Sequence, residues 1–387
     1  MHGNSILFLT NAYPDFESSY RGIFIKTLAL LLQKEEYQIS VVTPKIYSRS
    51  RYFEKQNGLK VYRFPFWARN KLLIEHKKIP YFKMILYYLT GVFLTLYAML
   101  KNRCCLIHVH WAIPTGLIGA WVGLLLRRRL VVTIHGSDLR MAVERNTFIR
   151  KIFVYVCRRA THVNCVSEVQ RKEVERLGIA GEKISVISMG IDEVFLETGK
   201  NRRLELTERP FVVFSNRNLY PIYNVSTLIR AIPMILKEEP KIQFIIAGNG
   251  SEKEILRKAV EDLNVSNSVQ FLGQVPHKDM PGLLAHSDIF VSTSPYDGTS
   301  VSLLEALACG TFPVVTDIPS NREWITDGKN GFLVPNGNET LLAEKIIDAI
   351  RNHKLLEEAG EKNQRIAERR ACWKGNVRKI RELYNSQ

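Results

Sequence analysis

Short, continuous apolar segments alternate with helix-like segments along most of the chain. In its first half we expect strands at residues 5–10, 37–44, 59–65, 105–111, 130–136 and 162–167, and helices at 27–33, 82–100, 114–126 and 168–178. Apolar runs without internal alternation are typical of parallel strands that are covered by helices on both faces. The first half is therefore predicted to be an α/β domain built on a parallel sheet.

The same pattern starts again after a polar stretch. Strands are expected at residues 211–217, 242–248, 269–273, 289–294 and 312–316, with helices at 225–237, 251–263, 278–287 and 300–310. A chain of 387 residues is also too long for one ordinary core. We therefore predict two doubly wound α/β domains, residues 1–197 and 211–365, joined by a linker at 198–210 and followed by a terminal helix at 366–387. A cleft between two such domains is the usual place for a ligand.

The segment after the strand at residues 289–294 concentrates groups that can bind a ligand. Asp297 precedes Glu305 by eight residues, and a polar turn between them opens an apolar helix. Carboxylates suit sugar hydroxyls, and the free N–H groups of a helix start suit phosphate oxygens. The combination favours a sugar nucleotide. The spacing also allows Asp297 to be a helix cap and Glu305 a solvated helix residue. The turn consists of Gly298, Thr299 and Ser300, and Thr299, Ser300 and Val301 are expected to begin the helix.

Four further residues lie at the carboxyl ends of predicted strands or in the loops after them and are candidates for the same chemistry. His135 can hydrogen-bond a sugar hydroxyl or assist a leaving group, or it can be a satisfied histidine beside a turn with Asp138 as a helix cap. Arg217 can form forked hydrogen bonds to a phosphate or a surface ion pair. Gly248 and Gly22 allow close approach of the backbone to a ligand, although ordinary turns use glycine too.

The chain is strongly basic, with a formal net charge of +16. Residues 45–83 hold eleven Lys or Arg and two acids, interleaved with aromatic residues. This composition favours anionic partners. It is typical of a segment at an anionic membrane surface, and it also fits a basic loop over an ordinary core. Charge alone suggests nucleic acid as well, but no nucleic-acid-binding motif accompanies it.

Residues 84–100 contain no charge over seventeen positions, which is the lower limit for a membrane-spanning helix. Because a predicted strand follows at once, we expect a buried or membrane-leaning domain helix rather than a spanning one. The N-terminal segment is expected to be a buried strand and not a signal peptide. Six cysteines without CxxC spacing indicate reduced thiols. A cytoplasmic protein is expected, peripheral at the inner face of the plasma membrane if the basic stretch binds lipid.

Two histidines, His108 and His110, share one face of the strand at residues 105–111. Neighbouring histidines can bind zinc. No third ligand stands at a recognisable spacing, so a metal site is not predicted.

The longest motif gives the chain a family resemblance. The segment SPYDGTSVSLLEALACG at residues 294–310, with PVVTDIPSNREWI and DGKNGFLVPNGN after it, resembles the Glu-x7-Glu motif and the downstream helix of the retaining glycosyltransferases of family 4. TIHGSD is similar to the family's donor-site histidine segment, RGIF to its N-terminal glycine loop, and helix 373–384 to the one that returns to the first domain. The resemblance covers nearly the whole chain and implies the GT-B fold, two Rossmann-like domains facing a central cleft.

The resemblance also implies roles for the site residues. Glu305 would hold the nucleotide ribose, Asp297 would contact the donor sugar, and His135 would contact that sugar near the reacting carbon. Arg217 would neutralise the leaving diphosphate, and Gly22 would let the first loop approach the donor. Catalytic residues are thus His135 and Asp297; donor-binding residues are Gly22, Arg217, Gly248, Gly298, Thr299, Ser300, Val301 and Glu305.

The implied reaction is retaining transfer of a sugar from a nucleotide-sugar donor to a lipid-linked or polysaccharide acceptor in cell-surface glycan biosynthesis, including lipopolysaccharide. No cofactor or metal is expected, because helix N–H groups and Arg217 can stabilise the leaving diphosphate and no DxD-like motif is evident. The alternatives are a sugar-nucleotide epimerase or a glycan phosphorylase, which share the architecture. The phosphorylase also requires a lysine for pyridoxal phosphate, and the sequence offers no clear candidate.

Two positions depart from the family pattern. Asp297 is shorter than the glutamate that is common there. A lysine is usual a few residues after the arginine, whereas this chain has Ile222 and Tyr223. A charged hydrogen bond contributes about 1.5–3 kcal/mol. We therefore expect another cation to replace the lysine, or weaker donor binding, or contact of Tyr223 and Asn224 with a different group.

Overall fold

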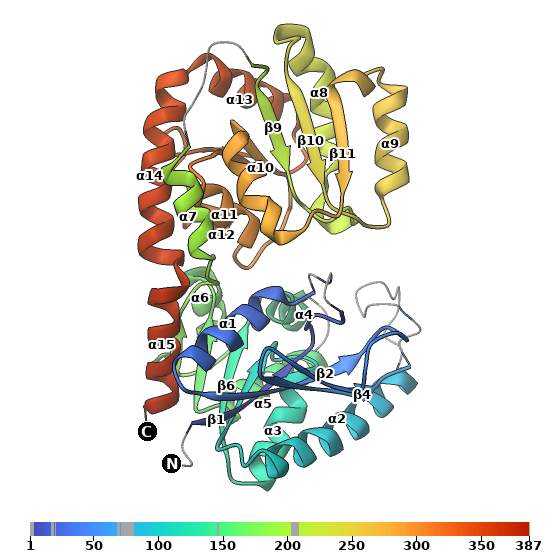
Figure 1. Ribbon diagram of the computed structural model, residues 1–387, viewed down its shortest axis with the longest axis vertical. Helices are drawn as coiled ribbons and strands as arrows, with labels where there is room; N and C mark the ends of the chain where they lie inside the picture. The colour runs from blue at the N-terminus through green and yellow to red at the C-terminus, as the bar shows by residue number, and fades with distance from the viewer. Residues whose placement is uncertain are drawn as a thin grey trace. The chain divides into compact units, whose positions relative to one another are not determined.

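The computed structural model describes residues 4–16, 19, 21–67, 70, 81–144, 147–202 and 209–386. The chain forms two compact units, Met1–Ser188 with Val377–Gln387, and Met189–Asn376. Each unit contains one sheet packed between helices (Figure 1). Both predicted parallel sheets are therefore confirmed.

The first unit has an eight-stranded sheet in the order β3-β4-β2-β1-β5-β6-β7-β8. All its neighbouring strands are parallel except β3 and β4. Its elements are β1 (Ser5–Thr10), α1 (Ile23–Lys34), β2 (Gln38–Lys45), β3 (Phe53–Gln56), β4 (Leu59–Pro65), α2 (Tyr81–Lys101), β5 (Leu106–His110), α3 (Thr115–Leu125), β6 (Arg129–Ile134), α4 (Ser137–Glu144), α5 (Thr147–Arg159), β7 (His162–Cys165), α6 (Glu168–Arg176), η2 (Gly181–Lys183) and β8 (Ile184–Val186).

The second unit has a six-stranded parallel sheet in the order β11-β10-β9-β12-β13-β14. Its elements are α7 (Glu193–Lys200), β9 (Val212–Ser215), η3 (Pro221–Tyr223), α8 (Ser226–Glu238), β10 (Gln243–Ala247), α9 (Lys253–Asp262), η4 (Ser266–Ser268), β11 (Val269–Gly273), η5 (His277–Asp279), α10 (Met280–His286), β12 (Ile289–Ser292), α11 (Val301–Ala308), β13 (Phe312–Thr316), α12 (Pro319–Arg322), β14 (Phe332–Val334), α13 (Glu339–Arg351) and α14 (His353–Ala371). The last helix, α15 (Trp373–Asn385), begins in this unit and ends in the first.

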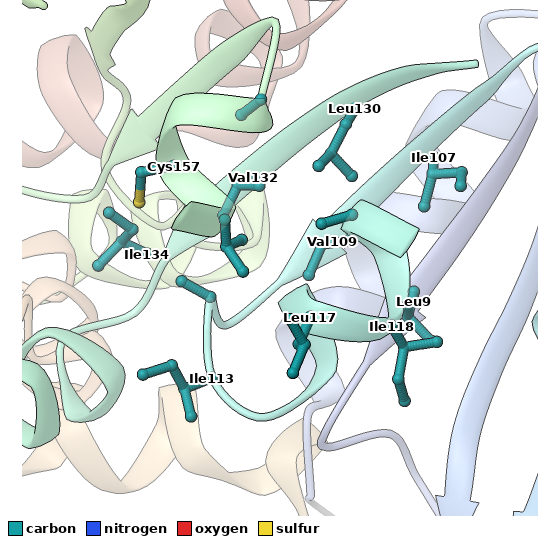
Figure 2. Close-up of a cluster of buried hydrophobic side chains, with 14 of the residues drawn as sticks. Leu9, Ile107, Val109, Ile113, Leu117, Ile118, Leu130, Val132, Ile134 and Cys157 are labelled. Carbon is teal, nitrogen blue, oxygen red and sulfur yellow. The ribbon is translucent and has the colours of Figure 1, made fainter. Parts of the chain in front are cut away.

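The core of the first unit lies between its sheet and the helices that cover it. Val109 of β5 and Val132 of β6 pack with Ile118 of α3 and Cys157 of α5 in one buried cluster (Figure 2). Every residue of β5 is buried, as continuous apolar strands in a parallel sheet require. The six cysteines are free thiols.

The strand register places three loops at one edge of the first sheet. Thr10 of β1 pairs with His110 of β5, which pairs with Thr133 of β6. The loops that follow these strands therefore start side by side at the carboxyl edge, where parallel α/β sheets bind ligands. His135 and the loop that ends at Gly22 belong to this edge.

Several predicted boundaries differ from the structure. The strand β3 and the helices α4 and α5 were not predicted. The first unit ends at Ser188 rather than at residue 197, because Phe195 and Leu196 of α7 are buried in a core of the second unit. Of the predicted linker at 198–210, residues 203–208 lie outside the described part, and Arg209 forms an ion pair with Asp288 of the second unit.

The C-terminal end of α15 packs on the first unit. The Tyr384 hydroxyl lies 2.6 Å from His108 Nδ1 on the central strand β5. Arg129 at the start of β6 donates to the Tyr384 carbonyl. The chain's last residues are thereby fixed to the strands that carry the His135 loop.

Of the two arrangements that we expected for the helix α2, buried or membrane-leaning, the structure does not show the buried one. The helix α2 is the one helix, among described residues, that is long and apolar enough to cross a membrane, and only 28% of its most apolar window is buried. Of the basic stretch at residues 45–83, residues 68–69 and 71–80 lie outside the described part.

Candidate functional site

The loop between β12 and α11 does not use Asp297 as a helix cap. The N-cap is Ser300, whose hydroxyl accepts a hydrogen bond from the Leu303 N–H at 3.3 Å. The helix begins at Val301, two residues later than Thr299. Helix geometry leaves the first N–H groups without partners inside the helix, and such groups bind anions. The structure thus keeps the predicted anion-binding helix start and excludes the capping alternative for Asp297.

Arg217 holds this loop at two points, its middle and its end. It follows β9, and its guanidinium donates to Asp297 Oδ2 at 2.7 Å and to Ser300 Oγ at 2.9 Å. Arg217 is 8% exposed, so the pair is not the surface ion pair that the sequence allowed. Burial raises the pKa of Asp297, and the neighbouring Arg217 charge opposes that rise. The cluster holds one cation beside the helix start, with Nε of Arg217 unpartnered among the described residues.

Tyr223 stands where the family usually carries a lysine. It lies in η3, and the Arg217 guanidinium carbon is 4.5 Å from the centre of its ring. This cation–π contact is worth about 0.5–2 kcal/mol. The position therefore supplies no second cation, but it orients the one that Arg217 provides. Asn224 uses its backbone carbonyl to accept from the Thr293 hydroxyl at 2.8 Å.

Glu305 is a buried carboxylate in an otherwise apolar helix, only 5% exposed. Its Oε1 lies 2.9 Å from Nε2 of His277, whose Nδ1 lies 3.8 Å from Asp192 Oδ2. Burial raises the pKa of Glu305, and the His277 hydrogen bond opposes the rise. Burial would lower the pKa of His277, but the hydrogen bond and charge of Glu305, with Asp192, raise it. The solvated-residue alternative for Glu305 is thus wrong.

His277 was not predicted from the sequence. It follows β11 at the carboxyl edge of the second sheet, the same edge from which Arg217 and Asp297 arise. That placement after a predicted strand was the signal that could have found it. Its pairing with Glu305, 28 residues away, depends on the packing of η5 against α11.

Replacing His277 by glutamine is expected to flatten the pH dependence of stability. Because the folded-state pKa of His277 is raised, its stabilising contribution is complete below its ordinary value of 6.5 and is lost as pH rises through the folded-state value. Glutamine keeps a hydrogen-bond donor but does not titrate. Urea unfolding at pH 6, 7.5 and 9 should therefore show wild type losing free energy of unfolding relative to His277→Gln. A difference in free energy of unfolding between wild type and His277→Gln that stays constant over this pH range contradicts a raised pKa of His277 in the folded chain.

The glycine at 248 has a packing reason for its identity. Gly248 has a φ of 137°, and a Cβ there would lie 2.4 Å from the Arg217 carbonyl oxygen. The turn after β10 thus packs directly on the backbone that carries Arg217. Contact of Gly248 with the donor stays a prediction.

In the first unit, His135 lies among rings at the carboxyl edge of β6. Its Nε2 is 3.1 Å from His110 Nδ1, and its ring centre is 4.3 Å from that of Trp111 and 5.3 Å from that of Phe24. Burial lowers the pKa of His135 to about 3, and the neighbouring His108 adds to this effect. The imidazole is therefore neutral near pH 7 and can donate or accept one hydrogen bond to a sugar hydroxyl.

Asp138 holds the backbone around His135 from the first turn of α4. Its carboxylate accepts from the Gly136 N–H at 3.0 Å and from the Ala112 N–H at 2.7 Å. It thereby ties the loop after β6 to the loop after β5. Burial raises the pKa of Asp138 to about 6, against these backbone hydrogen bonds.

The loop after β1 is held in a similar way. Arg21 pairs with Asp15 through contacts of 2.7 and 3.1 Å and donates to the Asn11 carbonyl. Gly22 has a φ of 68°, and a Cβ there would lie 2.2 Å from the Ala12 carbonyl oxygen. Only glycine therefore fits this close turn, which leads into α1.

His108 and His110 lie side by side, with ring centres 4.3 Å apart. The His108 nitrogens contact the Tyr384 and Thr133 hydroxyls, and His110 contacts His135. Within the described ranges, no group of three or more His, Cys, Asp or Glu is arranged to hold a metal ion. The histidine pair thus forms part of the support of His135.

Comparison with known proteins gives the chain relatives over most of its length. An uncharacterized glycosyltransferase of Methanocaldococcus jannaschii is 26% identical over 286 residues, 72% of this chain and 74% of the relative. The alpha-monoglucosyldiacylglycerol synthase of Streptococcus pneumoniae is 25% identical, covering 84% of this chain and 74% of the relative. The Anabaena protein HepE, solved in complex with UDP-glucose, superposes with a TM-score of 0.75 at 21% identity, covering 99% of this chain and 100% of HepE.

Two family descriptions match, one in each half. Residues 22–195 match Glycosyltransferase Family 4, and residues 198–366 match Glycosyl transferases group 1. The first match includes His135 and Gly22, and the second includes Arg217, Asp297 and Glu305. The chain belongs to the family 4 glycosyltransferases of GT-B fold and is an enzyme of the hexosyltransferase type.

Proposed function

We propose that this glycosyltransferase moves a sugar from a nucleotide-sugar donor to a lipid-linked or polysaccharide acceptor in cell-surface glycan biosynthesis, with retention of the anomeric configuration. The observation that carries the proposal is the cluster at the start of α11. At this point the buried Arg217 guanidinium contacts both Asp297 and the Ser300 N-cap, beside the first N–H groups of the helix. A diphosphate with an attached sugar is the ligand that needs this combination.

The second acid completes the match to a nucleotide sugar. Only Oε1 of Glu305 contacts His277, so the second carboxylate oxygen can accept from a ribose hydroxyl. The cost of burying that carboxylate inside an apolar helix is accounted for if it binds ligand. HepE was solved in complex with UDP-glucose, and the pneumococcal relative is a synthase of monoglucosyldiacylglycerol. These relatives support a nucleotide-sugar donor and a lipid acceptor.

Thermal stabilisation by donors tests the proposal directly. A nucleoside diphosphate at about 100 times its Kd adds about 2.7 kcal/mol to the stability of the folded chain. We expect one nucleoside diphosphate and its sugar conjugates to raise the Tm in a screen, and Glu305→Gln to abolish the rise without lowering the Tm of the free protein by a similar amount. A full response of the Glu305→Gln variant, or no response of wild type to any nucleotide, contradicts the proposal.

We propose that transfer needs no metal ion. Charge on the leaving diphosphate is met by Arg217 and the helix N–H groups, which are in place before the donor binds. Activity should be unchanged by EDTA. Retention is a separate expectation, and NMR of the first product formed should show the donor's anomeric configuration. Loss of activity in EDTA with recovery on adding Mg²⁺ or Mn²⁺ contradicts the metal-free mechanism.

The enzyme is proposed to act in the cytoplasm at the inner face of the plasma membrane. Its net charge of +16 and the basic, aromatic composition of residues 45–83 suit an anionic surface. A lipid-linked acceptor would be met at the same surface.

A further inference from the structure

The helix α2 carries a row of exposed apolar side chains along its outer side. Successive members are three or four residues apart, so they share one face of the helix. A helix on a water-facing surface normally carries polar residues there. The row consists of Phe82 (75% exposed), Ile85 (58%), Leu89 (66%), Phe93 (75%), Tyr97 (44%) and Leu100 (65%).

The neighbouring helix widens this apolar surface. On α3, Trp121, Leu124 and Leu125 are 43%, 52% and 68% exposed. The two helices lie side by side (Figure 1), and the ring centres of Tyr88 and Trp121 are 6.1 Å apart. We call the row on α2 together with these three residues the α2–α3 face. An apolar surface of this extent on a folded chain marks a binding surface.

An open cavity adjoins the face on its β-sheet side. It has a volume of about 670 Å³ and lies between α2 and the strands β3 and β4. Its walls include Leu89, Phe93 and Tyr97 of the row, with Tyr52 and Phe53 from the neighbouring hairpin. The apolar surface is therefore continuous from α3 across α2 to β3.

The charges that α2, α3 and the turns after them contribute have one sign. Residues 81–137 contain no Asp or Glu. Lys101 at the end of α2 and Arg103 in the turn after it are exposed, as are Arg127 and Arg128 in the turn after α3. Apolar and aromatic side chains bordered by cations are the composition that anionic bilayer surfaces bind.

The packing of α2 excludes a spanning arrangement. Its inner side is buried at Tyr87, Thr95 and Ala98 against the sheet and α3. A Cβ at Gly91 would lie 2.5 Å from Ile118 Cδ1, so the two helices are in close contact. Insertion of α2 across a bilayer would expose this core. The helix can instead lie in the plane of a membrane with only its outer side immersed.

We propose that the α2–α3 face docks the enzyme on an anionic lipid bilayer, with α2 parallel to the membrane plane. A second copy of the chain is a poorer occupant, because pairing of two such faces would bring together the cations of α2, α3 and the turns after them, and residues 81–137 supply no acid to offset them. The inference depends on the proposed function only because that function places the enzyme at a membrane. A chain that binds donor nucleotide but not vesicles would refute the inference alone.

Co-sedimentation of the full chain with vesicles tests the proposal. We expect binding to phosphatidylcholine vesicles containing 30% phosphatidylglycerol, much weaker binding to pure phosphatidylcholine, and weakening by salt. The variant Leu89→Gln/Phe93→Gln should lose at least tenfold in partition coefficient, because it removes two exposed apolar side chains from the face. The matched control is Ile255→Gln on α9, whose side chain is 65% exposed in the second unit and should leave partitioning unchanged.

A second variant tests the contribution of the cations beside the face to binding of anionic vesicles. Arg127→Gln/Arg128→Gln should reduce partitioning to anionic vesicles severalfold and leave binding to neutral vesicles unchanged. All variants alter exposed residues, and an unchanged Tm and donor response confirm that they fold. Equal partitioning of wild type and Leu89→Gln/Phe93→Gln overturns the proposal. So does a dimer in sedimentation velocity that this double variant abolishes, since the face would then be covered by a second copy.

Discussion

Replacing Arg217 by alanine is expected to lower kcat by about 100- to 1,000-fold, the range seen when one preorganised group that stabilises transition-state charge is removed. Its guanidinium carries five N–H donors, of which contacts to Asp297 and Ser300 use two. The remaining donors can meet the charge that grows on the leaving diphosphate. Because the Tyr223 ring lies over the guanidinium, the group is fixed before the donor binds.

The conservative variant separates charge from geometry. Arg217→Lys keeps the cation but loses the fork that reaches Asp297 and Ser300 together, so we expect an intermediate kcat. Steady-state kinetics on the identified donor measure both variants. Arg217→Ala also leaves the Asp297 carboxylate, whose side chain is only 19% exposed, without its partner, so the free energy of unfolding of this variant must be measured beside that of Asp297→Asn. A folded Arg217→Ala enzyme with kcat within threefold of wild type would show that the diphosphate is stabilised elsewhere.

The parts of the fold that could be predicted are those where local pattern and tertiary packing agree. Continuous apolar strands such as β1 and β5 are buried on both faces, and the structure has both where the sequence predicted them. The helix start at α11 followed from a strand, a small polar turn and an apolar helix in succession. The identity of the capping residue did not follow from the sequence, since Asp297 and Ser300 are both good caps. The long-range Arg217 contact decides between them.

The rest depends on contacts between distant segments. Local sequence places α7 in the first domain, but Phe195 is buried against the second core. The seventeen uncharged residues of α2 left a buried and a membrane-leaning helix both open, because composition does not show which side of a helix is covered. His277 was overlooked because only the fold brings it within 2.9 Å of Glu305. The buried polar network around Arg63 was likewise not predicted, because its partners come from two other segments, the loop after β1 and the segment that leads into and includes β3.

Arg63 lies at the centre of this buried polar network. It lies on β4, is 1% exposed, and its Nη2 is 2.5 Å from Glu54 Oε1 on the neighbouring strand β3. It also donates to the carbonyl of Pro14 at 2.7 Å and to that of Arg51 at 3.0 Å. Pro14 belongs to the loop that leads to Gly22. One arginine thus connects the edge of the sheet to a loop of the predicted donor site.

Glu54→Ala is therefore expected to lower the free energy of unfolding of the first unit by about 3–5 kcal/mol, the cost of leaving a buried charge without its partner. The matched control is Glu144→Ala, which breaks an exposed pair with Arg140 and should cost less than about 1 kcal/mol. Urea unfolding followed by circular dichroism measures both, and the loss should appear in the transition of the first unit only.

A double variant decides which part of the network matters most. Arg63→Met/Glu54→Leu removes both charges, and a buried ion pair replaced by apolar residues is often neutral. Here the Pro14 and Arg51 carbonyls would lose their donor, at about 1–3 kcal/mol for each buried group. The double variant should thus recover only part of the loss. Full recovery to wild-type stability would show that the two carbonyls find other donors, and that Arg63 does not hold the loop after β1.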